Sequence, residues 1–152
     1  MKFITYSYQG KPSYGIVKDE LIVDLGQRIG GDLKQLIADN GLPKAIDLAN
    51  ACDGDIPLAE VIYLPTIPNP EKIICIGVNY ANRNAEYRDN SADPEYPSVF
   101  MRAPDSLTGH RHNLIRPPES MQLDYEGEIV IVIGKSGHRI PQQQIMNSGA
   151  SI

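Results

Sequence analysis

The stretch Leu123-Asp-Tyr-Glu-Gly-Glu-Ile-Val-Ile-Val-Ile-Gly134 is the most informative part of this 152-residue chain. Its β-branched run from Ile129 to Ile133, closed by a glycine, is typical of a central strand. Successive side chains of a strand point to opposite faces, so Asp124, Glu126 and Glu128 are expected on one face. The pattern therefore predicts a buried strand whose first half presents three carboxylates.

Carboxylates beside an apolar core repel one another and lose hydration unless a cation offsets their charge. Since this stretch holds no Cys or His, its oxygen donors favour Mg²⁺, Mn²⁺ or Ca²⁺ over zinc or copper. Gly127, which has no Cβ, leaves room for a ligand or a second backbone. A solvated acidic strand end is the alternative interpretation, and it is the one that the spacing alone favours.

Upstream of this stretch, the apolar run Ile73 to Val78 predicts a second strand, buried on both faces. A short polar helix is expected from about residue 80 to 88, and a short strand over Ser98–Arg102 inside a proline-rich loop from 93 to 118. Three prolines in residues 65–70 predict an extended connector, the best candidate for a domain boundary.

The first 64 residues predict a small domain of their own. Three short runs of alternating apolar and polar residues, separated by turn residues, indicate an antiparallel meander. Two short helices and a strand are expected to follow it, with Asp32 as the N-cap of the first helix and Gly41 as its stop. The meander strands are expected at 1–8, 13–17 and 21–24, the helices at 32–40 and 43–51, and the later strand at 58–64.

The overall composition excludes several classes of partner. Lys and Arg number 14 against 19 Asp and Glu, a net charge of −5, which argues against binding to nucleic acid or an anionic membrane surface. No apolar run approaches the roughly 18 residues of a membrane span, and no signal peptide is recognised. Cys52 and Cys75 stand alone without metal-ligand spacing, as in a reducing compartment. We expect a cytoplasmic protein.

Three segments together resemble the fumarylacetoacetate hydrolase family. They are Lys72-Ile-Ile-Cys-Ile-Gly-Val-Asn-Tyr80, Pro97-Ser-Val-Phe100 with Pro104 and Ser106, and Asp124-Tyr-Glu-Gly-Glu-Ile-Val-Ile-Val-Ile-Gly-Lys135. The N-terminal meander with its helices resembles the accessory domain of bacterial members. The resemblance implies an α+β fold with an accessory domain at 1–64, a linker at 65–70, and the first part of a mixed β-roll catalytic domain at 71–152.

The resemblance also implies a function. It points to a divalent-metal-dependent hydrolase or lyase that cleaves a C–C bond in a 2-oxo or diketo acid, with Mg²⁺ or Mn²⁺ as cofactor and a homodimer as the assembly. The glutamates that match Glu126 and Glu128 are metal ligands in the family. A hard cation would chelate the substrate's carboxylate and 2-oxo oxygens and stabilise the enolate that forms on cleavage.

Tyr80, Arg102 and Ser106 are the candidates for substrate binding. Arg102 or, alternatively, Arg116 would hold the far end of an anionic substrate, although either arginine taken singly is better explained as an ordinary surface charge.

Two positions depart from the family pattern on the helix expected after Tyr80. A His and an acidic residue typically activate water there, but this chain has Arg83 and Glu86. Because a guanidinium stays protonated, Arg83 cannot be a general base, which leaves Glu86 as the base and Arg83 as its partner or a carboxylate-binding group. A surface ion pair between them is the alternative. His110 and, two residues further on, His112 are further candidates for the base.

A third metal ligand of the family, an aspartate beyond the Glu-Gly-Glu strand, has no counterpart in this chain, and the aperiodic segment after Pro141 predicts a truncated protein. Two hypotheses therefore stay open. One is the metal-dependent enzyme of aromatic-compound catabolism, with hydratase, isomerase or decarboxylase chemistry on 2-oxo acids as alternatives to cleavage. The other is a non-catalytic family member that acts as a dimerisation or binding module, or is a remnant.

Overall fold

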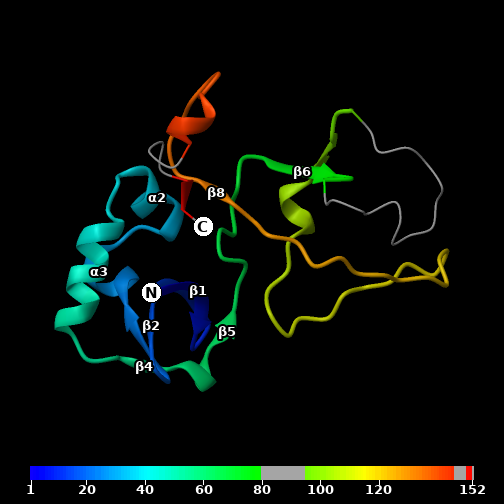
Figure 1. The fold of residues 1–152 in the computed structure, drawn as a ribbon. Helices are drawn as coiled ribbons and strands as arrows, with labels where there is room; N and C mark the ends of the chain where they lie inside the picture. The colour runs from blue at the N-terminus through cyan, green and yellow to red at the C-terminus, as the bar shows by residue number, and fades with distance from the viewer. Residues whose placement is uncertain (80–94, 146–149, 152) are drawn as a thin grey trace. The chain divides into compact units, whose positions relative to one another are not determined.

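The computed structural model describes residues 1–79, 95–145 and 150–151, and it divides the chain into two compact units (Figure 1). Unit 1 comprises Met1–Ile67 and Thr108–Ile152, and unit 2 comprises Pro68–Leu107. The division into an accessory domain, a linker and a catalytic part stays a prediction. No helix within the described ranges is long and apolar enough to cross a membrane.

Unit 1 is built on a five-stranded antiparallel sheet with the strand order β4-β3-β2-β1-β5. Its first three strands form the meander that the alternating pattern predicts. Gln9 and Gly10 both have positive φ in the first turn, which matches the twist of a two-residue hairpin. The strands are β1 (Lys2–Tyr8), β2 (Lys11–Lys18), β3 (Leu21–Asp24), β4 (Ile56–Pro57) and β5 (Ile62–Tyr63).

Both faces of this sheet are apolar, and each contributes to a separate core cluster. One face packs against the helices through Tyr14, Ile16 and Val23. The other face holds a second cluster that includes Tyr6 and Ile22. The alternation of side chains along each strand explains the two clusters. Residues paired on adjacent strands, such as Ile16 and Val23, lie on the same face of the sheet.

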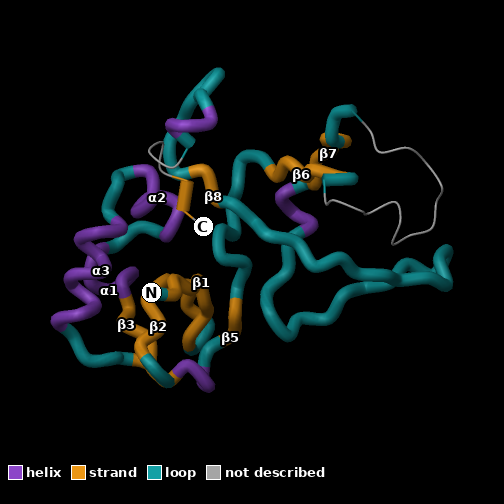
Figure 2. Tube along the Cα trace, viewed as in Figure 1, coloured by secondary structure: helices purple, strands orange, loops and turns teal. Residues whose placement is uncertain are grey.

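Three helices follow the meander and lie together on one side of the sheet (Figure 2). The predicted pair is present, with Asp32 accepting a hydrogen bond from the Gln35 amide as N-cap, but Gly41 is not the stop of the first helix. Asn40 takes the left-handed conformation there instead, with φ of 55°. Glycine is the most common residue in that conformation at a helix end, and asparagine also adopts it. The helices are α1 (Leu25–Ile29), α2 (Leu33–Ala38) and α3 (Leu42–Ala51).

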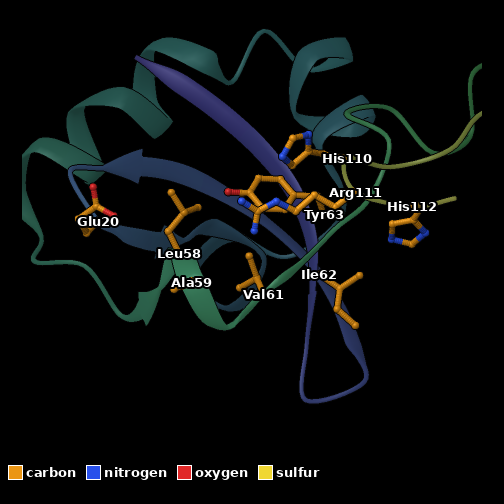
Figure 3. A pocket seen from close by; sticks show the side chains of 9 residues that line it. All are labelled: Glu20, Leu58, Ala59, Val61, Ile62, Tyr63, His110, Arg111 and His112. Atoms are coloured by element: carbon orange, nitrogen blue, oxygen red, sulfur yellow. The ribbon is translucent and has the colours of Figure 1, made fainter.

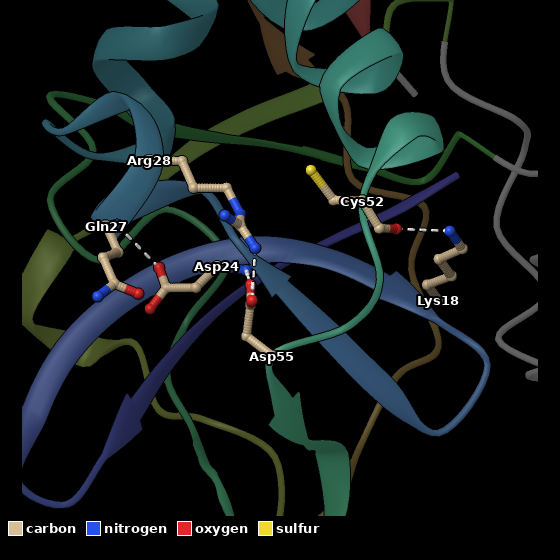
Figure 4. Close-up of polar contacts among 6 residues, drawn as sticks. All are labelled: Lys18, Asp24, Gln27, Arg28, Cys52 and Asp55. Carbon is tan, nitrogen blue, oxygen red and sulfur yellow. Dashed lines mark hydrogen bonds and ion pairs between the residues drawn. The ribbon is translucent and has the colours of Figure 1, made fainter.

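Helix α1 is absent from the sequence-based prediction, which ends a strand at Asp24 and continues as a loop. The Asp24 side chain caps this helix by accepting a hydrogen bond from the Gln27 amide at 3.0 Å and another from the Ser13 hydroxyl at 2.7 Å. Asp55 accepts from the Asp24 amide and forms an ion pair with Arg28 (Figure 4). The contacts with Ser13 and Asp55 come from distant segments, so a local pattern rich in glycine did not indicate the helix.

The strand predicted at residues 58–64 is wrong in its first half. Leu58–Glu60 forms a 3-10 turn after Pro57, whose φ of −61° suits the start of a turn, and only Ile62–Tyr63 pairs with β1.

Unit 2 contains a two-stranded antiparallel sheet of β6 (Ile73–Gly77) and β7 (Ser98–Arg102), as predicted for both segments. The expectation that the first of these is buried on both faces is wrong. Ile74 and Ile76 are 59% and 44% exposed, because the sheet has a single partner for each strand and no layer over it among the described residues. The helix expected at about 80–88 lies outside the described residues.

The central strand predicted over Leu123–Gly134 is also wrong for most of its length. Only β8 (Val132–Ile133) is a strand, paired with β9 (Ala150–Ser151), and the preceding residues are irregular and exposed. A strand needs a neighbouring backbone to satisfy its amide and carbonyl groups, and within the described ranges only β9 supplies one. Further 3-10 turns occupy Pro104–Ser106 and Gln142–Gln144.

Candidate functional site

Three of the predicted site residues cannot be placed. Tyr80, Arg83 and Glu86 lie outside the described residues.

The predicted metal ligands Glu126 and Glu128 are exposed and lie in irregular backbone of unit 1. In the ranges that the structure describes, no group of three or more His, Cys, Asp or Glu side chains gathers as a metal site would. The donor chemistry nevertheless fits a hard cation, since both side chains offer carboxylate oxygens. Gly127 between them has no heavy atom within 4 Å of the place where a Cβ would stand, so the approach to this segment is open. The ligand roles stay predictions.

The predicted substrate-binding residues of unit 2 make local contacts. The Arg102 guanidinium lies 5.7 Å from the centroid of the Phe100 ring on the same strand, a cation–π distance. The Ser106 hydroxyl donates to the Ala103 carbonyl oxygen at 2.7 Å and so closes a 3-10 turn. Both residues are exposed, and their roles in substrate binding stay predictions.

Arg116, the alternative anion-binding arginine, donates to the neighbouring Pro117 carbonyl oxygen at 3.3 Å. This contact orients the Arg116 side chain along its own loop in unit 1. Its role in substrate binding stays a prediction.

His110 and His112, the two candidate bases, both line a pocket of unit 1. The contacts of His110 are the better defined. Its ring meets the Tyr63 ring edge to face, with centroids 5.1 Å apart and planes at 76°. Gly109 lies against the Tyr63 carbonyl oxygen so closely that a Cβ there would clash with it. His112, the second candidate base, belongs to the same turn and donates its amide to the Gly109 carbonyl oxygen at 3.2 Å.

This pocket, which we call the β5 pocket, has a volume of about 420 Å³, within the usual range for small-molecule sites (Figure 3). Sequence reasoning missed most of its lining because the residues come from three separate segments with no common motif. The lining residues are Glu20, Leu58, Ala59, Val61, Ile62, Tyr63, His110, Arg111 and His112.

Comparison with known proteins bears on the segment that carries the Glu-Gly-Glu motif. Residues 72–148 match the family model described as fumarylacetoacetate (FAA) hydrolase C-terminal. The oxaloacetate tautomerase YisK of Bacillus subtilis (strain 168) is 36% identical over 94% of this chain and 55% of its own length. The mitochondrial oxaloacetate tautomerase Fahd2a of Rattus norvegicus is 37% identical over 60% of this chain and 28% of its own. The chain thus spans about half, or less, of the curated relatives it matches.

A solved structure supports the same placement at the level of the fold. The maleylpyruvate hydrolase from Sphingobium sp. SYK-6, crystallised with manganese(II) and pyruvate, superposes with a TM-score of 0.70 at 22% identity, covering 97% of this chain and 55% of that protein. The mixed α and β architecture with a curled antiparallel sheet is therefore common to both. Because the family model matches half of this chain, and a relative 36% identical to it matches along 94% of the chain, the chain belongs to the fumarylacetoacetate hydrolase family.

Proposed function

We propose that these residues belong to a divalent-metal-dependent enzyme that acts on a 2-oxo or diketo acid. The observation that carries the proposal is the 36% identity with an oxaloacetate tautomerase along 94% of the chain. The carboxylate pair of the Glu-Gly-Glu segment adds the donor chemistry that such an enzyme requires. Because the chain spans 55% of that relative, the proposal concerns the activity of the whole protein to which these residues contribute.

Glu126 and Glu128 would hold Mg²⁺ or Mn²⁺ through their carboxylate oxygens. When bound, the cation supplies positive charge that attracts the substrate's carboxylate and stabilises negative charge on the 2-oxo oxygen. The Sphingobium maleylpyruvate hydrolase, which shares the fold, was crystallised with manganese(II) and pyruvate, and this supports a divalent cation here without selecting between magnesium and manganese. Tyr80, Arg102 and Ser106 are proposed to contact the anionic substrate.

Keto–enol tautomerisation of a 2-oxo acid is the reaction that we favour. It moves one proton between carbon and oxygen, so a single base suffices, and Glu86 can act as that base. C–C bond hydrolysis, the reaction implied by the family resemblance, is the second candidate. It requires an activated water molecule, and Arg83 cannot take the proton because a guanidinium stays charged at physiological pH.

The first experiment tests the proposed metal ligands. Mn²⁺ is titrated into the purified chain and followed by its paramagnetic resonance signal, with Glu126→Ala and Glu128→Ala as the variants. Glu119→Ala is the matched control, because Glu119 is an exposed glutamate of the same unit outside the motif. Saturable binding that both variants abolish and the control retains supports the ligand roles. Equal binding by all the variants, or no binding by a folded sample, contradicts them.

The second experiment separates the two reactions. Loss of enol absorbance from oxaloacetate measures tautomerisation, and pyruvate release from maleylpyruvate, coupled to lactate dehydrogenase, measures C–C hydrolysis. We expect metal-dependent tautomerisation that Glu86→Gln lowers by about 100-fold, the lower range for loss of a general base. Arg83→His should raise hydrolysis relative to tautomerisation, since it restores a titratable base. A metal-loaded chain inactive in both assays would favour the non-catalytic alternative.

The homodimer and the cytoplasmic location stay predictions.

A further inference from the structure

We propose that the β5 pocket is a second ligand site, which binds a small organic monocarboxylate with an apolar body. Neither Glu126 nor Glu128 lines this pocket, so the proposal is independent of the metal ligands proposed above. It rests on four features of unit 1: an open hollow, a group of basic side chains at one end, a turn held in a disfavoured conformation, and a single acidic group at the other end.

Aliphatic side chains form a floor in this hollow, although more of its accessible lining is polar than apolar. Leu58, Val61 and Ile62 contribute aliphatic side chains, and Tyr63 adds an aromatic face. A neighbouring hollow of about 580 Å³ shares Glu20, Leu58, Tyr63 and His110 with the β5 pocket, so a ligand body longer than one ring has space to extend. Small-molecule sites combine this kind of apolar surface with a few polar groups that fix orientation.

One wall is formed by three consecutive basic side chains, His110, Arg111 and His112. The planar guanidinium of Arg111 matches a carboxylate through two parallel hydrogen bonds, and the imidazole N–H groups add further donors. Figure 3 shows the three side chains leaving the same segment in different directions, with Arg111 lying across Tyr63 and His112 farther from it.

The turn that presents Arg111 has a backbone conformation that an arginine disfavours. Arg111 has a φ of 64°, at the third position of the Gly109–His112 turn, where glycine is the usual residue. Unfavourable backbone conformations persist where the surroundings impose them, and they concentrate at ligand sites. Here the close packing of Gly109 on the Tyr63 carbonyl and the ring contact of His110 hold the turn against β5. The backbone that carries these donors is therefore held in place before a ligand arrives.

Glu20 sets the charge of the ligand. Figure 3 shows Glu20 at the end of the pocket opposite His112, with Leu58 and Tyr63 between them. A carboxylate bound at the basic wall would leave its apolar body directed along the floor toward Glu20. A second carboxylate at the far end of the ligand would meet like charge, so the site is expected to discriminate against dicarboxylates.

The test uses benzoate and terephthalate, which share one ring and differ by a second carboxylate at the opposite end. Each is titrated into the full chain, and the histidine ring signals are followed by NMR. We expect saturable shifts for benzoate and binding of terephthalate weaker by about tenfold or more. Glu20→Gln should remove that preference. Glu126→Ala and omission of divalent metal should leave benzoate binding unchanged, which separates this site from the proposed metal centre.

Three arginine variants decide whether the guanidinium binds the ligand. Arg111→Gln should weaken benzoate binding by about tenfold or more, the loss expected for a charged hydrogen bond. Arg111→Gly should do the same, although glycine suits the positive φ and preserves the turn. Arg139→Gln is the matched control, because Arg139 is also exposed with positive φ, at 53°, but lines neither hollow. Shifts that do not saturate, full binding by either Arg111 variant, or a preference for terephthalate would overturn the proposal.

Discussion

Among single residues, Asp24 joins the end of β3 to the start of α1 through contacts with three other segments. Its carboxylate is nearly buried and accepts from the Ser13 hydroxyl and the Gln27 amide, while its own amide donates to Asp55 at 2.8 Å. Asp32 caps α2 with a similar local bond to the Gln35 amide at 2.8 Å, but it lies on the surface. The two caps thus differ mainly in burial.

Replacing Asp24 with alanine is therefore expected to lower the free energy of unfolding by about 2–3 kcal/mol, because a cap is lost and the Ser13 hydroxyl loses its acceptor. The matched variant Asp32→Ala should lower it by about 1 kcal/mol, the ordinary value of a surface cap. Urea unfolding followed by circular dichroism measures both. A loss for Asp24→Ala no larger than that for Asp32→Ala would contradict this account of the buried cap.

Tyr6 makes the stability of unit 1 sensitive to alkaline pH. Its side chain is fully buried, and its hydroxyl has no hydrogen-bond partner in the part of the chain that the structure describes. Burial raises the pKa of Tyr6 from its ordinary value of 10.0 to about 12. The nearby Ser13 hydroxyl acts against this rise, and the negative charges of Asp24 and Asp55 add to it. Burial also raises the pKa of Tyr14.

A raised pKa means that the folded state prefers the protonated phenol. The contribution of Tyr6 is complete below pH 10, where the unfolded chain is also protonated, and is lost between about pH 10 and 12, a fall of about 2–3 kcal/mol. Tyr6→Phe should flatten this fall and cost little at pH 7, because it removes a buried hydroxyl without a partner. Tyr125→Phe, at an exposed position, should leave the wild-type profile unchanged. An equally steep fall in Tyr6→Phe would show that other groups cause it.

At the scale of elements, the predictions succeed where a strand or helix is stabilised by near neighbours. The β1–β2–β3 meander has short turns and extensive pairing between consecutive strands. The first predicted helix begins after its predicted cap, Asp32, and the second begins one residue before its predicted start. The predictions fail for residues 123–131, which have strand propensity but no neighbouring backbone in the described ranges. Propensity alone does not satisfy backbone hydrogen bonds.

Hydrogen exchange measured by mass spectrometry checks this difference between elements. Peptides covering β1 and β2 should exchange slowest, because their amides are paired in the centre of the sheet. Peptides covering residues 123–131 should exchange within the shortest labelling time. Protection of that segment comparable to β1 would mean that the central strand predicted from the sequence does form in solution.

At the scale of the whole molecule, apolar side chains that would normally be buried are exposed in both units. In unit 1 they run along residues 114–133, with Ile129 at 75% and Ile131 at 54% exposure. In unit 2 they lie on β6 and β7, including Ile74 and Phe100. Exposed apolar strand segments associate readily with other chains or with hydrophobic dyes.

We therefore expect concentration-dependent self-association in sedimentation velocity and strong fluorescence with a hydrophobic dye. The double substitution Ile129→Lys with Ile131→Lys should reduce both, because it places two charges on the apolar run. Ile115→Lys, at a residue that is 92% exposed but outside residues 129–133, should reduce them less. A chain that stays monomeric at every concentration, or equal effects of the two variants, would rule out association through residues 129–133.

The amino-acid sequence by itself determined the N-terminal meander, the two predicted helices and, through the segments that include the Glu-Gly-Glu motif, the family. These features depend on neighbours within a few residues or on a contiguous motif, so their physical causes are visible in a linear pattern. Only the tertiary structure decided the helix at 25–29, the exposure of β6 and residues 123–131, and the β5 pocket. Those features depend on which distant backbones lie beside each other: Asp24 needs Ser13 and Asp55, and the pocket needs Tyr63 beside the turn at 109–112.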